Sequence, residues 1–264
     1  MESYPRNGKI RTDASFRETV CHGSEEYPFQ YYQEDIWQYD FHCIDWHWHD
    51  EVELVFVEKG TAEVFVGSDR HILGREMGVF INSQTVHKFE ATESTLIPNI
   101  VFSPSLLARE DGLLYQKYIH PVLASPIKCL VFSANDPGQG EIADVLRAVF
   151  AIQEGALCEI KTVALLLHLW GILYEKIGGA GNPFVPQPSA RTQAQLQIMM
   201  QYIHKNYPCQ ISLDNIADTV SLSKSSVLQI FSQNIHTSPI GYLVNYRLKR
   251  AAKRLASTQD SISI

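Results

Sequence analysis

The sequence lacks the features that mark secreted and membrane-spanning proteins. Its five cysteines are scattered and show no CxxC spacing, which favours a reducing compartment over a disulfide framework. No apolar run reaches the roughly 18 residues that a membrane-spanning helix requires, and the first residues carry no apolar signal segment. We therefore expect a cytoplasmic protein that has no contact with a membrane.

Positive charge is scarce overall but is concentrated late in the chain. The net charge is −7. From residue 191 onward, eight lysines and arginines stand against three aspartates, a net charge of +5, so the preceding residues carry −12. This asymmetry predicts a small basic module joined to an acidic one, with nucleic acid as a partner of the basic part.

The pattern of predicted elements changes twice along the chain. Up to residue 102, β-branched and aromatic stretches separated by glycine turns predict an antiparallel barrel or sandwich. The clearest strands are expected at 51–57, 61–66 and 77–81. Residues 103–180 show helical spacing of apolar side chains. Helices are expected at 104–119, 140–154 and 159–177. A stretch rich in glycine and proline at 181–191 predicts a linker to the last segment, 192–264.

Two short helices joined by a tight turn are predicted after the linker. Ser212 is a good N-cap for a helix over 213–220, and Ser223 for a second helix over 224–234. Apolar residues at helical spacing give the second helix one buried face. Its opposite face carries small polar side chains that suit hydrogen bonding to base edges in the major groove of DNA. These predicted base-reading residues are Ser225, Ser226 and Gln229.

A long basic helix is predicted to begin near Pro239. We expect its apolar residues to face inward: Leu248, Ala251, Ala252 and Leu255. Outward cations hold a protein on DNA phosphates without reading the base sequence. The predicted phosphate contacts are Lys224, Arg247, Arg250 and Arg254. A small structural helical domain with a solvated basic face is the alternative interpretation.

Residues 195–257 resemble the DNA-binding region of the AraC/XylS family of bacterial transcription regulators. The similarity rests on ISLDNIA at 211–217, on LSKSSVLQIF at 222–231, and on the basic helix that follows. The resemblance implies two helix–turn–helix units joined by that helix, with 224–234 as the first recognition helix. The last residues, 261–264, resemble the opening of the second unit, whose remainder is absent, so we expect one recognition helix alone to bind DNA weakly.

The densest group of chemically active side chains lies at 46–53, in the sequence WHWHDEVE. Strand alternation places His47, His49 and Glu53 on one side, and His87 follows two further predicted strands. The spacing of the first three residues and of Gly60 resembles the first cupin motif, and His87 stands at the place of the second motif's histidine. The rest of the second motif is poorly matched.

Three interpretations of this histidine and glutamate cluster remain open. In the first, which we favour, the four side chains are polar contacts for an effector and no cofactor is needed. In the second, the same four residues hold a divalent metal, because three imidazoles and a carboxylate suit zinc, iron or manganese. In the third, the cluster is structural. The AraC/XylS resemblance implies a small-molecule effector, often a sugar, and a homodimer formed through the helices before the linker, where Leu165, Leu166, Leu169, Ile172 and Leu173 make a broad apolar face.

Together these observations predict an α+β protein. We expect a cupin-like antiparallel β-barrel at 1–102, a helical dimerisation segment at 103–180, a linker at 181–191, and an all-α DNA-binding region at 192–264. The predicted function is a non-enzymatic transcription regulator that binds double-stranded DNA and responds to an effector in the barrel. The alternatives are a cupin metalloenzyme with a helical tail, and a truncated dimerising regulator without operator binding of its own.

Overall fold

The structure is a computed structural model that describes residues 10–13, 16–67, 69–178, 189–235 and 237–257. The chain forms two compact units, one made of Met1–Arg11 with Glu18–Pro186 and the other of Thr12–Arg17 with Gln187–Ile264. Most of the predicted linker, and the last residues that resemble a second helix–turn–helix unit, lie outside the described residues. Within the described ranges, no helix is both long and apolar enough to cross a bilayer.

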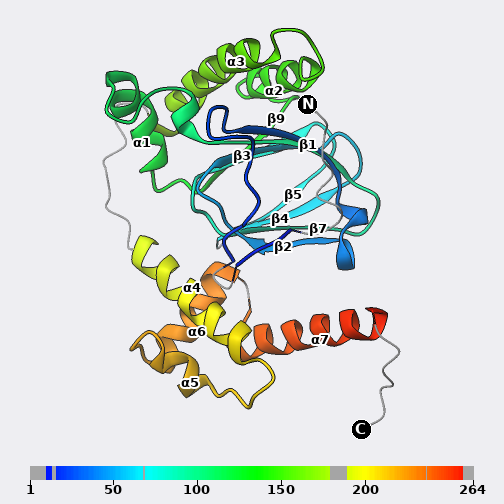
Figure 1. The fold of residues 1–264 in the computed structure, drawn as a ribbon, viewed down its shortest axis with the longest axis vertical. Helices are drawn as coiled ribbons and strands as arrows, with labels where there is room; N and C mark the ends of the chain where they lie inside the picture. Colours follow the sequence, from blue (N-terminus) through cyan, green and yellow to red (C-terminus); the bar gives the residue numbers. More distant parts are fainter. Residues whose placement is uncertain (1–9, 14–15, 68, 179–188, 236, 258–264) are drawn as a thin grey trace. The chain divides into compact units, whose positions relative to one another are not determined.

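The first unit contains the strands and the second unit contains only helices, so the fold is α+β (Figure 1). The strands are β1 (Phe29–Asp35), β2 (Cys43–His47), β3 (Val52–Phe56), β4 (Ala62–Val66), β5 (Asp69–Leu73), β6 (Met77–Ile81), β7 (His87–Ala91), β8 (Leu96–Phe102) and β9 (Cys129–Ser133). The α-helices are α1 (His120–Leu123), α2 (Gly140–Ala151), α3 (Cys158–Leu173), α4 (Ser189–Asn206), α5 (Leu213–Asp218), α6 (Lys224–Ile235) and α7 (Pro239–Ser257).

Two antiparallel sheets form the cupin-like barrel of the first unit. One has the strand order β1-β8-β3-β6-β9 and the other has the order β2-β7-β4-β5. The inner faces of both sheets contribute to one apolar core, in which Val55 and Val79 of the larger sheet join Val64 and Phe89 of the smaller. A residue that points inward from either sheet is therefore shielded from solvent.

Helices α2 and α3 cover the outer face of the five-stranded sheet (Figure 1). Strand β3 shows the alternation clearly, because Leu54 and Phe56 pack in the core shared with the helices while Val55 packs in the core between the sheets. Glu53 therefore points into the barrel with Val55. A carboxylate buried in that position needs a cation or hydrogen-bond donors.

Two expectations for residues 103–180 were wrong. The stretch 104–119 is not one helix: a 3₁₀ turn covers Pro104–Leu106, and a π-helical turn covers Tyr115–Ile119 before α1. Strand β9 also lies in this region and pairs with β6, with Cys129 opposite Ile81. The barrel therefore extends past its predicted end at residue 102, whereas α2 and α3 begin within a residue of their expected positions.

The second unit is a helical bundle, and the predicted N-caps and tight turn of its two short helices are confirmed. Ser212 and Asn215 form a reciprocal capping box at the start of α5, and the Ser223 hydroxyl accepts a hydrogen bond from the Ser226 amide at the start of α6. Ser221 provides the tight turn, with a φ of 53°. The core is built from one face of each helix: Met199, Met200, Ile203, Ile216, Val227, Phe231 and Leu243.

One expectation for α7 was wrong. Leu248, Ala251, Ala252 and Leu255 were predicted to face inward, but Leu248 and Leu255 are 63% and 42% exposed, Ala251 is exposed and Ala252 is half-buried. Leu243 and Tyr242, nearer the start of α7, supply the buried contacts instead. The short segment Thr12–Arg17 also belongs to this unit, where the Phe16 ring packs on His204 with a centroid distance of 4.3 Å.

Candidate functional site

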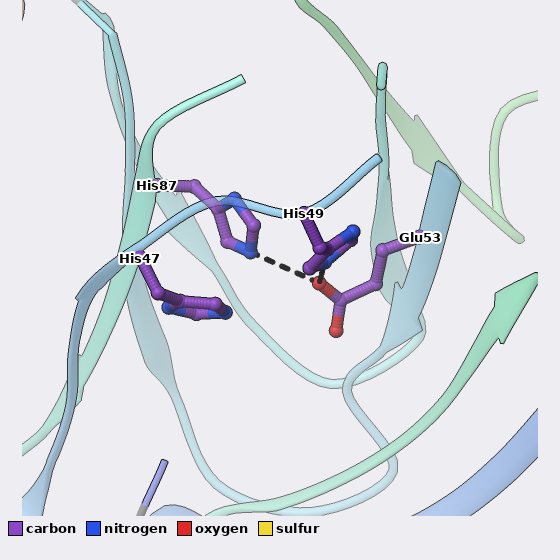
Figure 2. A group of neighbouring side chains, drawn as sticks. All are labelled: His47, His49, Glu53 and His87. Carbon is purple, nitrogen blue, oxygen red and sulfur yellow. Dashed lines mark hydrogen bonds and ion pairs between the residues drawn. The ribbon is translucent and has the colours of Figure 1, made fainter. Parts of the chain in front are cut away.

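The four residues predicted from the cupin-like spacing meet inside the barrel (Figure 2). His47 ends β2, His87 begins β7 directly opposite it, and Glu53 lies in β3. His49 lies in the turn after β2 rather than in a strand. All four are at most 3% exposed, and one ligand atom from each lies within 4.8 Å of the others.

Backbone carbonyls fix the orientation of all three imidazole rings. The Nδ1 atom of His47 lies 2.8 Å from the carbonyl oxygen of Asp45, and that of His87 lies 2.8 Å from Thr85. His49 Nδ1 lies 3.1 Å from the carbonyl oxygen of Glu51. A carbonyl oxygen only accepts, so each Nδ1 must donate its proton. The Nε2 atom of each neutral ring then carries a lone pair.

The lone pairs of His49 and His87 face the carboxylate of Glu53. Its Oε2 atom lies 3.0 Å from His87 Nε2 and 3.4 Å from His49 Nε2 (Figure 2). A lone pair facing a carboxylate oxygen is repulsive unless a proton or a metal cation lies between them. Burial by itself raises the pKa of Glu53, yet contact with the two histidines brings that pKa well below its usual value.

His47 differs from the other two histidines. Burial, helped by the neighbouring His87, holds the pKa of His47 well below its usual value, so the ring is neutral at neutral pH. Its Nε2 atom is buried and has no hydrogen-bond partner among the described residues. A buried acceptor without a partner is uncommon and requires an explanation.

Two further buried polar residues adjoin the cluster and were missed by sequence analysis. The amide of Glu18 donates to the carbonyl of Trp48 over 2.8 Å, and the carboxylate of Glu18 lies 3.4 Å from His22 Nε2. The His22 ring packs against that of His49, with centroids 5.4 Å apart. Both residues precede the first strand in irregular chain, where no periodicity could reveal that they are buried.

The predicted base-reading residues lie together at the N-terminal end of α6. Ser225 and Gln229 are exposed and Ser226 is half-buried. The Ser223 hydroxyl lies 2.9 Å from those of both Ser225 and Ser226. Leu228 is 41% exposed beside them. The first turns of α6 thus offer hydroxyl and amide groups together with one apolar side chain.

The predicted phosphate-binding cations differ in their surroundings. Lys224 forms an exposed ion pair with Asp214, and Arg254 is exposed. The Arg250 guanidinium lies 5.6 Å from the centre of the Tyr207 ring. Arg247 donates from Nε to the carbonyl of Tyr207 and from Nη2 to that of Cys209. Arg247 therefore anchors α7 to the end of α4, and its predicted phosphate contact stays a prediction.

A ligand-binding barrel joined to a helix–turn–helix unit defines an effector-responsive transcription regulator. Residues 31–170 match the family model described as the AraC-like ligand binding domain. Because this match spans more than half of the chain, the chain belongs to that family, the ligand-binding domains of AraC-type transcription regulators. The resemblance of residues 195–257 to AraC/XylS regulators is thereby confirmed by an independent match over residues 31–170.

Curated relatives align over most of the chain. The uncharacterised HTH-type transcriptional regulator YdeC of Bacillus subtilis (strain 168) is 25% identical over 95% of this chain and 86% of its own length. The HTH-type transcriptional activator RhaS of Yersinia pestis bv. Antiqua (strain Angola) is 22% identical over 82% of this chain and 77% of its own. A crystal structure of ToxT from Vibrio cholerae aligns with 82% of this chain and 98% of its own at 10% identity and a TM-score of 0.40.

Proposed function

We propose that this transcription regulator binds a divalent transition metal at His47, His49, Glu53 and His87, and that occupancy of this site is the signal that changes its binding to DNA. The observation that carries the proposal is the unpartnered Nε2 atom of His47 beside two other Nε2 atoms that face Glu53. One cation placed among the four donor atoms removes every repulsive contact at once.

The four side chains fit a metal site in ligand type, in spacing and in the hydrogen bonds that orient the histidine rings. Imidazole and carboxylate bind zinc at about 2.0–2.2 Å, so two ligand atoms of one ion lie at most about 4.4 Å apart. The present spread, within 4.8 Å, needs only a small contraction. Each histidine also donates its other ring N–H to a carbonyl, the outer contact that metal-binding histidines usually make.

Protonation of the histidines, without a metal, is a less favourable way to remove the repulsion with Glu53. Protonating His49 and His87 would allow both to donate to Glu53, but it would bury two positive charges against one carboxylate in a site that is at most 3% exposed. Burying an excess charge is costly. It would also leave His47 Nε2 without a partner, because that atom makes no hydrogen bond to Glu53 among the described contacts.

We assign the metal a regulatory role, because the relatives that align along this chain are named as transcription regulators. A small-molecule effector that coordinates the ion through oxygen atoms, such as a sugar, could complete the signal. The effector can act only if it binds two states of the protein with different affinity.

On the DNA side, we propose that α6 enters the major groove. Gln229 suits a bidentate contact with adenine, and Ser225 and Ser226 suit either base of a pair. The exposed Leu228 can contact a thymine methyl group. We assign phosphate contacts to Lys224, Arg250 and Arg254. Lysine and arginine side chains that contact phosphates position a protein on the duplex without reading its sequence.

We further propose a homodimer formed through α3. Leu166, Leu169 and Leu173, which were predicted to serve dimerisation, are buried in the core of their own unit. A different stripe of α3 is exposed, with Ile160 68% exposed and Leu167 45% exposed. Ala164 and Gly171 continue it. Spacings of three and four residues make this a coiled-coil seam, and the small residues allow a second copy of the helix to approach closely.

Metal analysis of the purified chain tests the metal site. We expect His47→Ala to bind one divalent ion fewer per chain than the wild type, and the metal to raise the melting temperature of the wild type more than that of His47→Ala. His120→Ala, at an exposed histidine, is the matched control and should retain the ion. A wild-type chain that stays metal-free after incubation with zinc, iron and manganese would overturn the proposal.

A further inference from the structure

A second group of side chains with metal-ligand donor atoms lies in the barrel and shares no residue with the first. It consists of Asp69 and His71 in β5 and Cys129 in β9. One ligand atom from each lies within 4.8 Å of the others, and Cys129 Sγ lies 3.5 Å from His71 Nε2. These three side chains come from the two separate sheets.

Alternation places all three side chains on the inward side of their strands, where Asp69 at the start of β5 is exposed and His71 and Cys129 are half-buried. In β5, Asp69 and His71 lie on the same face as Leu73, which is fully buried in the core between the sheets. The alternate residue Ile72 is 63% exposed. In β9, Cys129 packs against the same inner core. The three ligand atoms therefore face one another across the space between the sheets.

The site occupies the place where the barrel is not held by backbone hydrogen bonds. Strand β5 is the last strand of the four-stranded sheet, and β9 is the last strand of the five-stranded sheet. Edge strands have unpaired backbone groups on one side. Contacts between side chains of β5 and β9 can therefore join the two sheets at this edge. An ion shared by β5 and β9 would join the two sheets at this edge.

We infer that Asp69, His71 and Cys129 bind a zinc-like divalent ion that links the edges of the two sheets. A thiolate, an imidazole and a carboxylate are the three donor types that zinc accepts in proteins. Lys128 lies close enough for its charge to act on both Asp69 and Cys129. A bound ion must compete with this ammonium group, so we expect weaker binding here than at the first site.

A reactive thiol is the other use that such a group could have. Nucleophilic cysteines require a lowered thiol pKa. Burial and the charge of Asp69 instead raise the pKa of Cys129 to about 11. A thiol with a raised pKa is a poor nucleophile, and an ion bound beside Asp69 and His71 would have to displace the thiol proton.

Titration of the full-length chain with Co²⁺ tests the inference, because of the two clusters found among the described residues only this one contains a cysteine. A thiolate bound to cobalt gives a near-ultraviolet charge-transfer band, whereas the cluster of His47, His49, Glu53 and His87 cannot. We expect this band in the wild type and in His49→Ala, and its loss in Cys129→Ser. Cys209→Ser, at an exposed cysteine, is the control and should keep the band.

Two further variants keep the test independent of folding. His71→Gln and Asp69→Asn retain the thiol and should weaken cobalt binding, while circular dichroism reports whether each variant is folded. Zinc should raise the melting temperature of His49→Ala but not that of His49→Ala/Cys129→Ser. A wild-type chain without the charge-transfer band, or a band that persists in Cys129→Ser, would overturn the inference.

Discussion

Histidine tautomers decide the chemistry of the barrel interior. The carbonyls of Asp45 and Thr85 each accept a hydrogen bond from a histidine Nδ1 atom, and in a neutral ring this contact leaves the Nε2 atom with a lone pair. The local sequence, with carbonyls two residues before each ring, creates this constraint. One ligand atom from each of the four cluster residues can therefore face a common metal ion.

Arg247 and Arg254 lie two turns apart on α7 and should behave differently when replaced. Arg247→Ala removes two hydrogen bonds to backbone carbonyls, and we expect it to destabilise the second unit by about 1–3 kcal/mol. Amide hydrogen exchange of α4 and α7 in the intact chain measures this loss. Unchanged exchange would contradict the anchoring role.

Arg254→Ala is the matched comparison at an exposed position. We expect the free energy of unfolding to change by less than about 0.5 kcal/mol. Affinity for DNA should fall, and the slope of its salt dependence should decrease by about one. Equal salt slopes for the wild type and this variant would remove Arg254 from the phosphate contacts.

At the scale of elements, the close packing of β6 between β3 and β9 depends on Gly78. A Cβ atom at this position would lie 2.3 Å from the Phe132 ring and 2.5 Å from the carbonyl oxygen of Val55. We expect Gly78→Ala to lower the free energy of unfolding by about 1–3 kcal/mol or more. Gly74→Ala, where nothing lies within 4 Å, should change it little. Urea denaturation compares the two.

Helix α3 offers a test of self-association. Leu167→Glu places a charge in the exposed stripe that contains Ile160 and Ala164, and we expect it to convert a dimer into a monomer because an unpaired charge would be buried in the interface. Sedimentation velocity measures the change. Leu113→Glu adds the same charge at a residue that is 76% exposed elsewhere and should leave the dimer intact. A wild-type monomer at micromolar concentration would contradict the proposed interface.

The elements that sequence reasoning found are those whose signals are local. The capping serine Ser212 and the apolar periodicity of α6 located the helix–turn–helix unit to within a residue or two. Strand β5 was missed because it is an edge strand whose residues Arg70 and Ile72 face solvent. Strand β9 was missed because it returns to the sheet from a helical region, which only its pairing with β6 reveals.

The same distinction applies to the candidate site. The spacing of His47, His49 and Glu53 could be recognised because the three lie within one turn and its flanking strands. Glu18 and His22 could not, since their burial depends on contacts with Trp48 and His49, which are distant in sequence. The proximity of Asp69 to Cys129 could likewise not be predicted, because it arises only when the edges of the two sheets come together in the fold.

At the scale of the whole molecule, function requires that the barrel and the helical unit influence one another. The chain belongs to a family of ligand-binding domains found in transcription regulators, and its two units carry different chemistry. Typical coupling between two sites changes affinity about 5- to 150-fold. The proposed metal site and the proposed DNA surface should be linked by a change of that order.

The most direct test measures DNA affinity with and without the metal. Duplexes selected by the chain from a random library would be titrated with metal-loaded and chelator-treated protein at fixed salt, in the wild type and in His47→Ala. We predict that loading changes the wild-type dissociation constant at least about fivefold and leaves that of His47→Ala unchanged. Equal affinities of the two wild-type forms, with the metal shown to be bound, would contradict the account.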